Sequence, residues 1–168
     1  MIDPAIAART PLRFAMVTTF YPPFNFGGDG IYVQRLARAL VARGHHVEVI
    51  HDTNGYRSMT GTDPELPAQP DPADDGIIVH RLRSKHPMLA ALQVQQFGQP
   101  GVHRAEIAAL LGDRFDVIHT HNISLVGGPG IWELGTAIKL HTAHEHWLVC
   151  ASHILWRDNR EICDERHC

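Results

Sequence analysis

The amino-acid sequence predicts a Rossmann-like α/β fold: a doubly wound parallel sheet with flanking helices in a single domain. Short apolar segments alternate with amphipathic helical segments along the chain, which is typical of such sheets. The first apolar segment is nearly continuous, as in a strand that is buried on both faces. At 168 residues the chain is long enough for one complete core, and it holds no internal repeat.

The first strand–helix–strand unit lies between residues 13 and 51. Residues 13–20 (RFAMVTTF) are predicted to form a buried strand between flanking prolines. Residues 31–43 follow as an amphipathic helix that ends at Gly44, a favourable residue after a helix C-terminus. Apolar and polar residues then alternate over residues 45–51, which predicts a second strand. The whole unit has the length of one right-handed crossover.

The next segment, residues 53–76, is predicted to be a surface loop. Its second part, TDPELPAQPDPADDG, holds four prolines and five acidic residues, which do not sustain a helix or a central strand. The loop is either a tolerated insertion or a lid over a substrate. Strands and helices then alternate again, with strands predicted at 76–82, 115–121 and 138–144 and helices at 88–97, 102–111 and 129–137.

Composition excludes several classes of protein. The formal net charge is -3 and 20% of the residues are charged, so no polybasic surface for nucleic acid is expected. No run of 18 apolar residues and no secretory leader is present, and a cytoplasmic location is therefore expected. The three cysteines cluster near the C-terminus, which is not the distribution of a disulfide framework.

A glycine-rich turn precedes the first helix, at an edge where doubly wound sheets bind ligands. Unpaired amides at a helix start, near the positive end of the helix dipole, can bind a phosphate, and glycine leaves them accessible. Two other interpretations stay open. The glycines could only permit a tight turn. Alternatively, Gly28, Gly30 and Asp52 could belong to an NAD(P)-binding oxidoreductase, although the third glycine of its motif is missing.

Three segments resemble landmarks of the family-4 glycosyltransferases, in order and spacing. They are PPFNFGGDGIYVQRLARALVARGHHVEVI (22–50), FDVIHTHN (115–122) and HTAHEHWLVC (141–150). The resemblance implies a GT-B enzyme, in which two Rossmann-like domains enclose the active site and transfer a sugar from a nucleotide-sugar donor with retention. It implies that residues 13–149 form the N-terminal, acceptor-side domain, after an extension at residues 1–12. The acceptor is not identified.

The same resemblance suggests roles for individual residues. Gly27 and Gly28 would lie near the donor diphosphate, where amide donors or a cationic histidine stabilise the leaving group. His121 would be the catalytic histidine that reaches the transferred sugar. The neighbouring His119 is expected to face away from His121. The residues predicted on the acceptor and sugar side are Asn122, His144 and Glu145.

No pair of carboxylates suggests a glycoside hydrolase. The C-terminal domain of the family, which carries most contacts with the nucleotide-sugar, has no counterpart in the sequence. We therefore expect this chain to be part of an enzyme, to bind the donor weakly and to transfer little or no sugar alone. Exposed arginines on the 31–43 helix suggest peripheral association with the inner face of the cell membrane, although such a helix is usually only a solvated face.

The tail at residues 150–168 contains thiols and imidazoles at short separations. Such groups can bind zinc, although their spacing matches no zinc finger closely, and a zinc-organised binding module is a further alternative. Free thiols in a frayed terminus are the other interpretation. The candidate ligands are Cys150, His153, Cys163, His167 and Cys168.

Overall fold

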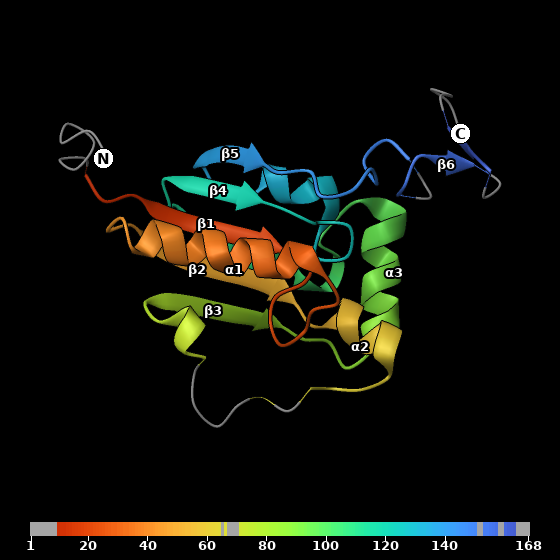
Figure 1. Cartoon of the computed structure of the whole chain (residues 1–168), viewed down its shortest axis with the longest axis horizontal. Helices are drawn as coiled ribbons and strands as arrows, with labels where there is room; N and C mark the ends of the chain where they lie inside the picture. The colour runs from red at the N-terminus through yellow and green to blue at the C-terminus, as the bar shows by residue number, and fades with distance from the viewer. Residues whose placement is uncertain (1–9, 65, 67–70, 151–152, 158–159, 164–168) are drawn as a thin grey trace.

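The structure is a computed structural model that describes residues 10–64, 66, 71–150, 153–157 and 160–163. Five parallel strands form the main sheet in the order β3-β2-β1-β4-β5 (Figure 1). The strands are β1 (Arg13–Thr18), β2 (His46–Asp52), β3 (Ile77–Leu82), β4 (Val117–Thr120) and β5 (Ile138–His141). The predicted Rossmann-like parallel fold is confirmed.

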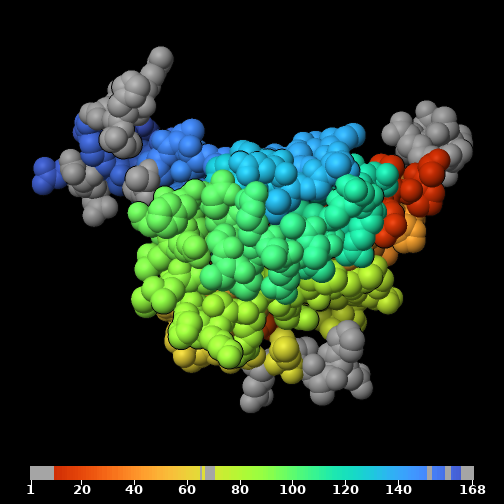
Figure 2. Space-filling view, turned by 180° about the vertical axis from the view of Figure 1, so that it is seen from behind, coloured from red at the N-terminus to blue at the C-terminus, as the bar shows by residue number. Residues whose placement is uncertain are grey.

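Helices cover both faces of this sheet. Helix α1 (Gly28–Val41) lies in front of β1 and β2 in Figure 1. Helix α4 (Arg104–Leu111) and the 3₁₀ helix η3 (Gly128–Glu133) pack on the opposite face, in the green-to-teal segment of the rear view (Figure 2). Alternate side chains of the central strand enter the two cores, because Met16 packs with α1 whereas Ala15 and Val17 pack with α4.

The strand order reverses between β1 and β4. From β1 the chain moves outward through β2 to β3, and after β4 it moves in the other direction to β5. The loops that leave β1 and β4 therefore separate at the carboxyl edge of the sheet. In open parallel sheets this reversal creates the crevice in which ligands bind.

Two helices lie beyond the carboxyl ends of the strands (Figure 1). They are α2 (Asn54–Thr60) and α3 (Pro87–Phe97), which contact each other, and the short helix η2 (Gly101–His103) joins α3 to α4. Helix α3 begins with proline at its first position and is followed by Gly98 with a φ of 62°, the left-handed conformation that favours glycine.

The prediction that residues 53–76 are a loop throughout is wrong. They contain α2 and the 3₁₀ helix η1 (Pro72–Asp74). Helix α2 forms because the carboxylate of Asp52 accepts hydrogen bonds from the amides of Asn54 and Gly55, at 3.0 and 3.1 Å. These bonds satisfy donors that would otherwise be unpaired at the helix start.

Two further differences concern short elements. The helix predicted at 129–137 is the 3₁₀ helix η3, since the glycine-rich segment is too short for a stable α-helix and ends before Gly135, which has a φ of 66°. In the tail, β6 (Trp156–Arg157) and β7 (Glu161–Ile162) pair as an antiparallel two-stranded sheet that the sequence did not predict.

Gly30 permits a close approach between α1 and the turn before it. A Cβ at this position would lie 2.3 Å from the Asn25 Oδ1 atom and 3.0 Å from the backbone oxygen of Phe20. At Gly28, in the same helical turn, a Cβ would have no atom within 4 Å. Gly30 is therefore required by packing, whereas Gly28 is not.

We predict that Gly30→Ala lowers the free energy of unfolding by about 2 kcal/mol, because the added methyl group overpacks the turn. Gly28→Ala is the matched control and should change it by less than about 0.5 kcal/mol. Urea denaturation of both variants measures the difference. Equal stability of the two variants would contradict this account of the turn.

Candidate functional site

Three of the segments singled out in the sequence meet at the carboxyl edge of the sheet. The backbone N–H of Thr19, after β1, donates to the carbonyl of Asn122, after β4, at 2.6 Å. The Asn122 side chain donates to the Asp29 carboxylate at 3.2 Å, which joins this loop to the start of α1. The ring of Tyr32 on α1 lies 5.2 Å from that of His144, after β5. The fold thus brings together residues separated by more than a hundred positions.

The glycine turn presents accessible backbone at this edge. Gly27 is the cap residue of α1 and has an extended conformation, and it has no side chain to accept a hydrogen bond from the first helical turn. No atom lies within 4 Å of the Cβ position of Gly27 or Gly28, and the Gly28 amide has no hydrogen-bond partner among the described residues. The Gly30 amide, in contrast, donates to the Asp29 carboxylate at 2.8 Å.

Buried aromatic residues hold the turn in place. Tyr21 and Phe24 are buried, and their rings lie 5.7 and 5.8 Å from the ring of His51 on β2. The Tyr21 hydroxyl donates to Asp74 at 2.6 Å, and burial together with this carboxylate raises the pKa of Tyr21. Asp74 also accepts from Gln34 at 3.0 Å. The proline-rich segment therefore anchors the turn through Asp74.

The imidazole of His51 is neutral because it is buried. The side chain is fully buried, and neither ring nitrogen has a hydrogen-bond partner among the described residues. Burial lowers the pKa of His51 to about 3, and the positive charge of Arg81 acts in the same direction.

A cluster of histidines lies after β4 and β5. His121 is 1% exposed, and its Nδ1 lies 3.1 Å from the Nε2 of His144. The ring of His119 lies 4.2 Å from that of His121, so the expectation that the two face apart is wrong. Side chains two positions apart along a strand share a face, and the alternation applies only to adjacent residues.

His121 is not cationic. Burial lowers its pKa to about 3, and the neighbouring His119, His144 and His141 lower it further. Of the two groups considered for stabilising the leaving group, amide donors and a cationic histidine, the lowered pKa of His121 favours the amide donors, and a neutral His121 acts through an N–H or a nitrogen lone pair. Its Nε2 is buried with no hydrogen-bond partner in the described part of the chain. A sugar would reach this atom only after side chains around it move, and the rings of His144 and Tyr32 lie 5.3 and 5.8 Å from the His121 ring.

The remaining predicted site residues are Glu145 and the candidate zinc ligands of the tail. Glu145 is half-buried, and its carboxylate accepts a hydrogen bond from the Nδ1 of His153. Cys150 is buried and Cys163 is half-buried. Among the described residues no group of three or more histidine, cysteine or acidic side chains could hold a metal ion. His167 and Cys168 lie outside the described residues, so the zinc site stays a prediction.

The geometry does not favour the dinucleotide alternative. Asp52, its expected ribose ligand, is 1% exposed, and both of its carboxylate oxygens accept hydrogen bonds from the start of α2. Burial raises the pKa of Asp52 to about 6, against the opposing effect of these amide donors. The space beside the Gly30 backbone is filled by the side chain of Asn25. Neither residue is free to contact a cofactor.

A hollow of about 470 Å³ lies at the same edge, between α2 and α3. The sequence did not predict it, because helical periodicity does not reveal that α3 lies across the ends of the strands. We call it the α2–α3 hollow. It is lined on one side by Met59, Met88 and Leu92 and on the other by Asn122, Glu145 and His153.

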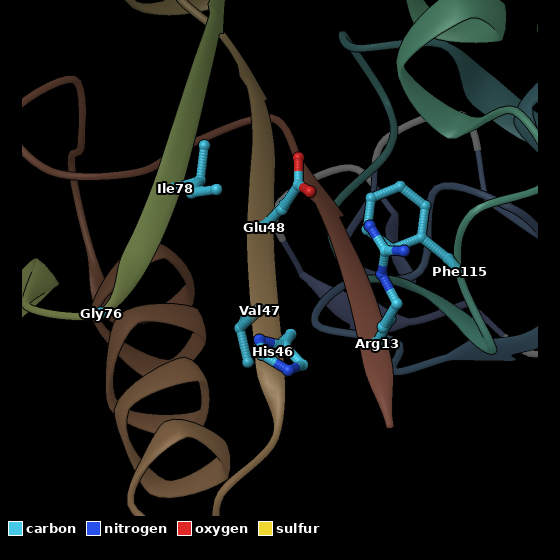
Figure 3. Close-up of a pocket in the computed structure, with 7 residues that line it drawn as sticks. All are labelled: Arg13, His46, Val47, Glu48, Gly76, Ile78 and Phe115. Carbon is cyan, nitrogen blue, oxygen red and sulfur yellow. The ribbon is translucent and has the colours of Figure 1, made fainter. Parts of the chain in front are cut away.

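Another hollow, of about 340 Å³, lies at the opposite, amino edge of the sheet. Figure 3 shows Arg13 on β1 beside the Phe115 ring, with Glu48 on the neighbouring β2. Glu48 accepts from Arg114 at 2.8 Å and lies 2.6 Å from the Nε2 of His80, so its charge is already compensated. None of the predicted site residues that the structure describes lines this hollow, and the carboxyl edge is therefore the candidate site.

Residues 27–161 match the family model described as glycosyl transferase 4-like domain. The chain belongs to this family. The match begins at Gly27, the first residue of the open glycine turn, and it includes β4, β5 and the loops that follow them. The family resemblance inferred from the three sequence segments is thereby confirmed.

This glycosyl transferase 4-like domain is also similar to a Methanocaldococcus jannaschii protein named as an uncharacterized glycosyltransferase. The two are 34% identical over 119 residues, which cover 66% of this chain and 25% of the relative. The chain thus spans about a quarter of the length of that relative. In the part of the domain that the structure describes, no helix has the length and hydrophobicity needed to cross a bilayer.

We predict that His51 makes the domain less stable in acid. Below about pH 6.5 the unfolded chain protonates this histidine, whereas the folded chain stays neutral until about pH 3, so the free energy of unfolding falls as the pH is lowered through this window. His51→Leu should remove about 1.4 kcal/mol of this loss per pH unit.

Urea denaturation at several pH values between 7 and 4.5 tests this prediction. At pH 7 the variant should be as stable as the parent or more stable, because two unpaired buried nitrogens are removed. Parallel pH profiles of the parent and the variant would show that His51 does not titrate as described.

Proposed function

We propose that this chain is the N-terminal, acceptor-side domain of a retaining glycosyltransferase with the GT-B arrangement. The enzyme would transfer a sugar from a nucleotide-sugar donor to an acceptor of unknown identity. The observation that carries the proposal is the open turn at Gly27 and Gly28, which lies where the strand order reverses. Family membership supports glycosyl transfer in general.

The turn is suited to stabilise a leaving diphosphate. Negative charge accumulates on the diphosphate as the bond to the sugar breaks, and fixed amide donors stabilise that charge without reorganising. The start of the 14-residue helix α1 adds the positive end of its dipole. The buried supports of the turn, Tyr21 and Phe24, keep these donors in one position. Gly27 and Gly28 are therefore the proposed diphosphate-binding residues.

His121 is the proposed catalytic residue, through contact with the transferred sugar. As a neutral imidazole it can exchange one hydrogen bond with a sugar hydroxyl once the rings of Tyr32 and His144 have moved. Asn122, His144 and Glu145 are the proposed residues on the sugar and acceptor side, because they surround this position at the ends of β4 and β5.

The complete enzyme would need a second domain that binds most of the nucleotide-sugar. The length of the archaeal relative supports this, because the match covers only 25% of it. We propose a cytoplasmic location with peripheral contact at the inner membrane face. Membrane contact is supported by three exposed arginines on and after α1: Arg35, Arg38 and Arg43. Flotation with anionic vesicles tests this contact.

We predict that Gly28→Ala weakens binding of uridine or guanosine diphosphate by about tenfold or more, because a methyl group would enter the space proposed for the phosphate. The same variant should keep its stability, so the loss would report on the site and not on folding. Isothermal titration calorimetry of the parent and the variant measures the change, with NAD as the competing ligand class. Unchanged affinity, or tighter binding of NAD than of either diphosphate, would refute the proposal.

We further expect that the purified 168-residue chain transfers little or no sugar, because in the proposed GT-B enzyme a second domain holds most of the donor, and this chain spans about a quarter of the archaeal relative. Incubation with radiolabelled nucleotide-sugars and a mixture of acceptors measures transfer and hydrolysis. Robust turnover by this chain alone would mean that the proposed division between two domains is wrong.

A further inference from the structure

The α2–α3 hollow lies next to the candidate site and shares Asn122 with it. Its volume of about 470 Å³ is within the range of pockets that bind small molecules. Side chains of α2 and α3, most of them apolar, form one wall, which we call the apolar wall. The other, which we call the polar wall, carries Asn122, Glu145 and His153. This division indicates the kind of ligand that the hollow would accept.

The apolar wall is formed by side chains that remain largely open to solvent. Met59, Met88 and Leu92 line the hollow and are 67%, 61% and 46% exposed. Helix α3, which provides two of them, carries no charged residue along its length. Exposed apolar side chains that surround a concave surface favour an apolar ligand, and methionine adapts to its shape.

The polar wall presents an oriented imidazole. Glu145 accepts a hydrogen bond from the Nδ1 of His153, which places the proton of this ring on Nδ1. The Nε2 of His153 lies 3.4 Å from the Nε2 of Gln95, an amide nitrogen that only donates. The single Nε2 lone pair of the neutral ring therefore faces this long contact with Gln95, and a ligand hydroxyl would bind there by replacing Gln95 as the donor.

The backbone at His153 is strained in a way that is common at binding sites. Its φ is 68°, in the left-handed region that residues with side chains rarely adopt. Two backbone hydrogen bonds hold it there, from the His153 amide to Cys150 at 3.0 Å and from the His146 amide to His153 at 2.9 Å. These bonds and the contact with Glu145 fix the imidazole at the polar wall.

We propose that the α2–α3 hollow binds the acceptor, and that the acceptor joins an apolar arm to a hydroxyl-bearing head. The arm packs on Met59, Met88 and Leu92, and a hydroxyl of the head donates to the Nε2 of His153. This inference rests on the proposed function for its link to sugar transfer. It assigns His153 to the acceptor and not to zinc.

The test uses n-octyl β-D-glucopyranoside, an amphiphile with hydroxyls, below its critical micelle concentration. Methyl β-D-glucopyranoside is the matched ligand without the apolar arm. In an NMR titration of the ¹⁵N-labelled chain, the octyl compound should shift the amide resonances of Asn122, Leu125 and α3. The methyl compound should bind at least about tenfold more weakly, because it lacks the buried chain.

Two substitutions on α3 distinguish binding in the hollow from binding to other exposed apolar side chains of this helix. Leu92→Glu places a charge inside the hollow and should weaken binding of the octyl compound about tenfold. Leu89→Glu is the control, because Leu89 is on the same helix and 66% exposed but does not line the hollow. Its affinity should stay within about twofold of the parent. Equal losses in both variants would overturn the proposed site.

A third variant tests the hydrogen bond at His153. His153→Asn removes the imidazole and keeps a residue that tolerates the left-handed backbone. It should weaken binding of the octyl compound about three- to tenfold. The substitution should not change the affinity for the fully O-methylated analogue, which keeps the octyl chain but has no hydroxyl to donate. The role of His153 would be overturned if the variant bound both ligands equally more weakly. It would also be overturned if the parent chain bound one equivalent of zinc and the variant bound none.

Diphosphate binding is measured on the same samples and distinguishes the two proposals. If uridine or guanosine diphosphate binds but the octyl compound produces no shifts around the hollow, the inference fails and the proposed function stands. If the octyl compound binds as described and no diphosphate binds, the hollow is supported as an amphiphile site whereas the proposed transferase function fails.

Discussion

The hydrogen bond between Thr19 and Asn122, at 2.6 Å, holds together the two loops on which the candidate site depends. The loop after β1 continues into the glycine turn, and the loop after β4 carries His121 and Asn122. Because β1 and β4 pair in parallel, both strands end at the carboxyl edge of the sheet. The strand order reverses between them, so the loops that follow them run in opposite directions. The glycine turn and the buried imidazoles therefore lie at the same edge of the sheet because of the sheet topology.

Burial determines the charge of the histidines at this edge of the sheet. Histidines are abundant in the sequence, but burial lowers the pKa of His51 and of His121 to about 3. A buried imidazole that stays neutral avoids the cost of desolvating a charge, and it can still exchange hydrogen bonds. Positive potential for a diphosphate would therefore come from the start of α1 and its amides, not from the histidine cluster.

The sequence predicted the sheet and its principal helices because their periodicity and flanking residues are local signals. Gly28, Asn122 and His144 lie at one edge, as expected for residues that follow predicted strands of a parallel sheet. Helix α2 was missed because its start depends on Asp52, which belongs to the preceding strand and caps it. The burial of His121 was not predicted because rings that lie near it come from α1 and from the loop after β5, far away in the sequence.

In the tail, the spacing of cysteines and histidines along the sequence did not predict which side chains are in contact. Closely spaced cysteines and histidines suggested zinc, yet the structure turns His153 towards Glu145, eight positions earlier, and α3 contributes Gln95 to the same place. This arrangement depends on how an irregular loop folds over the end of the sheet. No periodic pattern encodes it, and the α2–α3 hollow that it borders was missed for the same reason.

A crystal structure of the chain with uridine or guanosine diphosphate would test the central claim most directly. The account predicts a phosphate oxygen within about 3.2 Å of the Gly28 amide nitrogen, with the turn unchanged. Binding of the diphosphate at the amino edge beside Arg13, or contact through side chains alone, would contradict it.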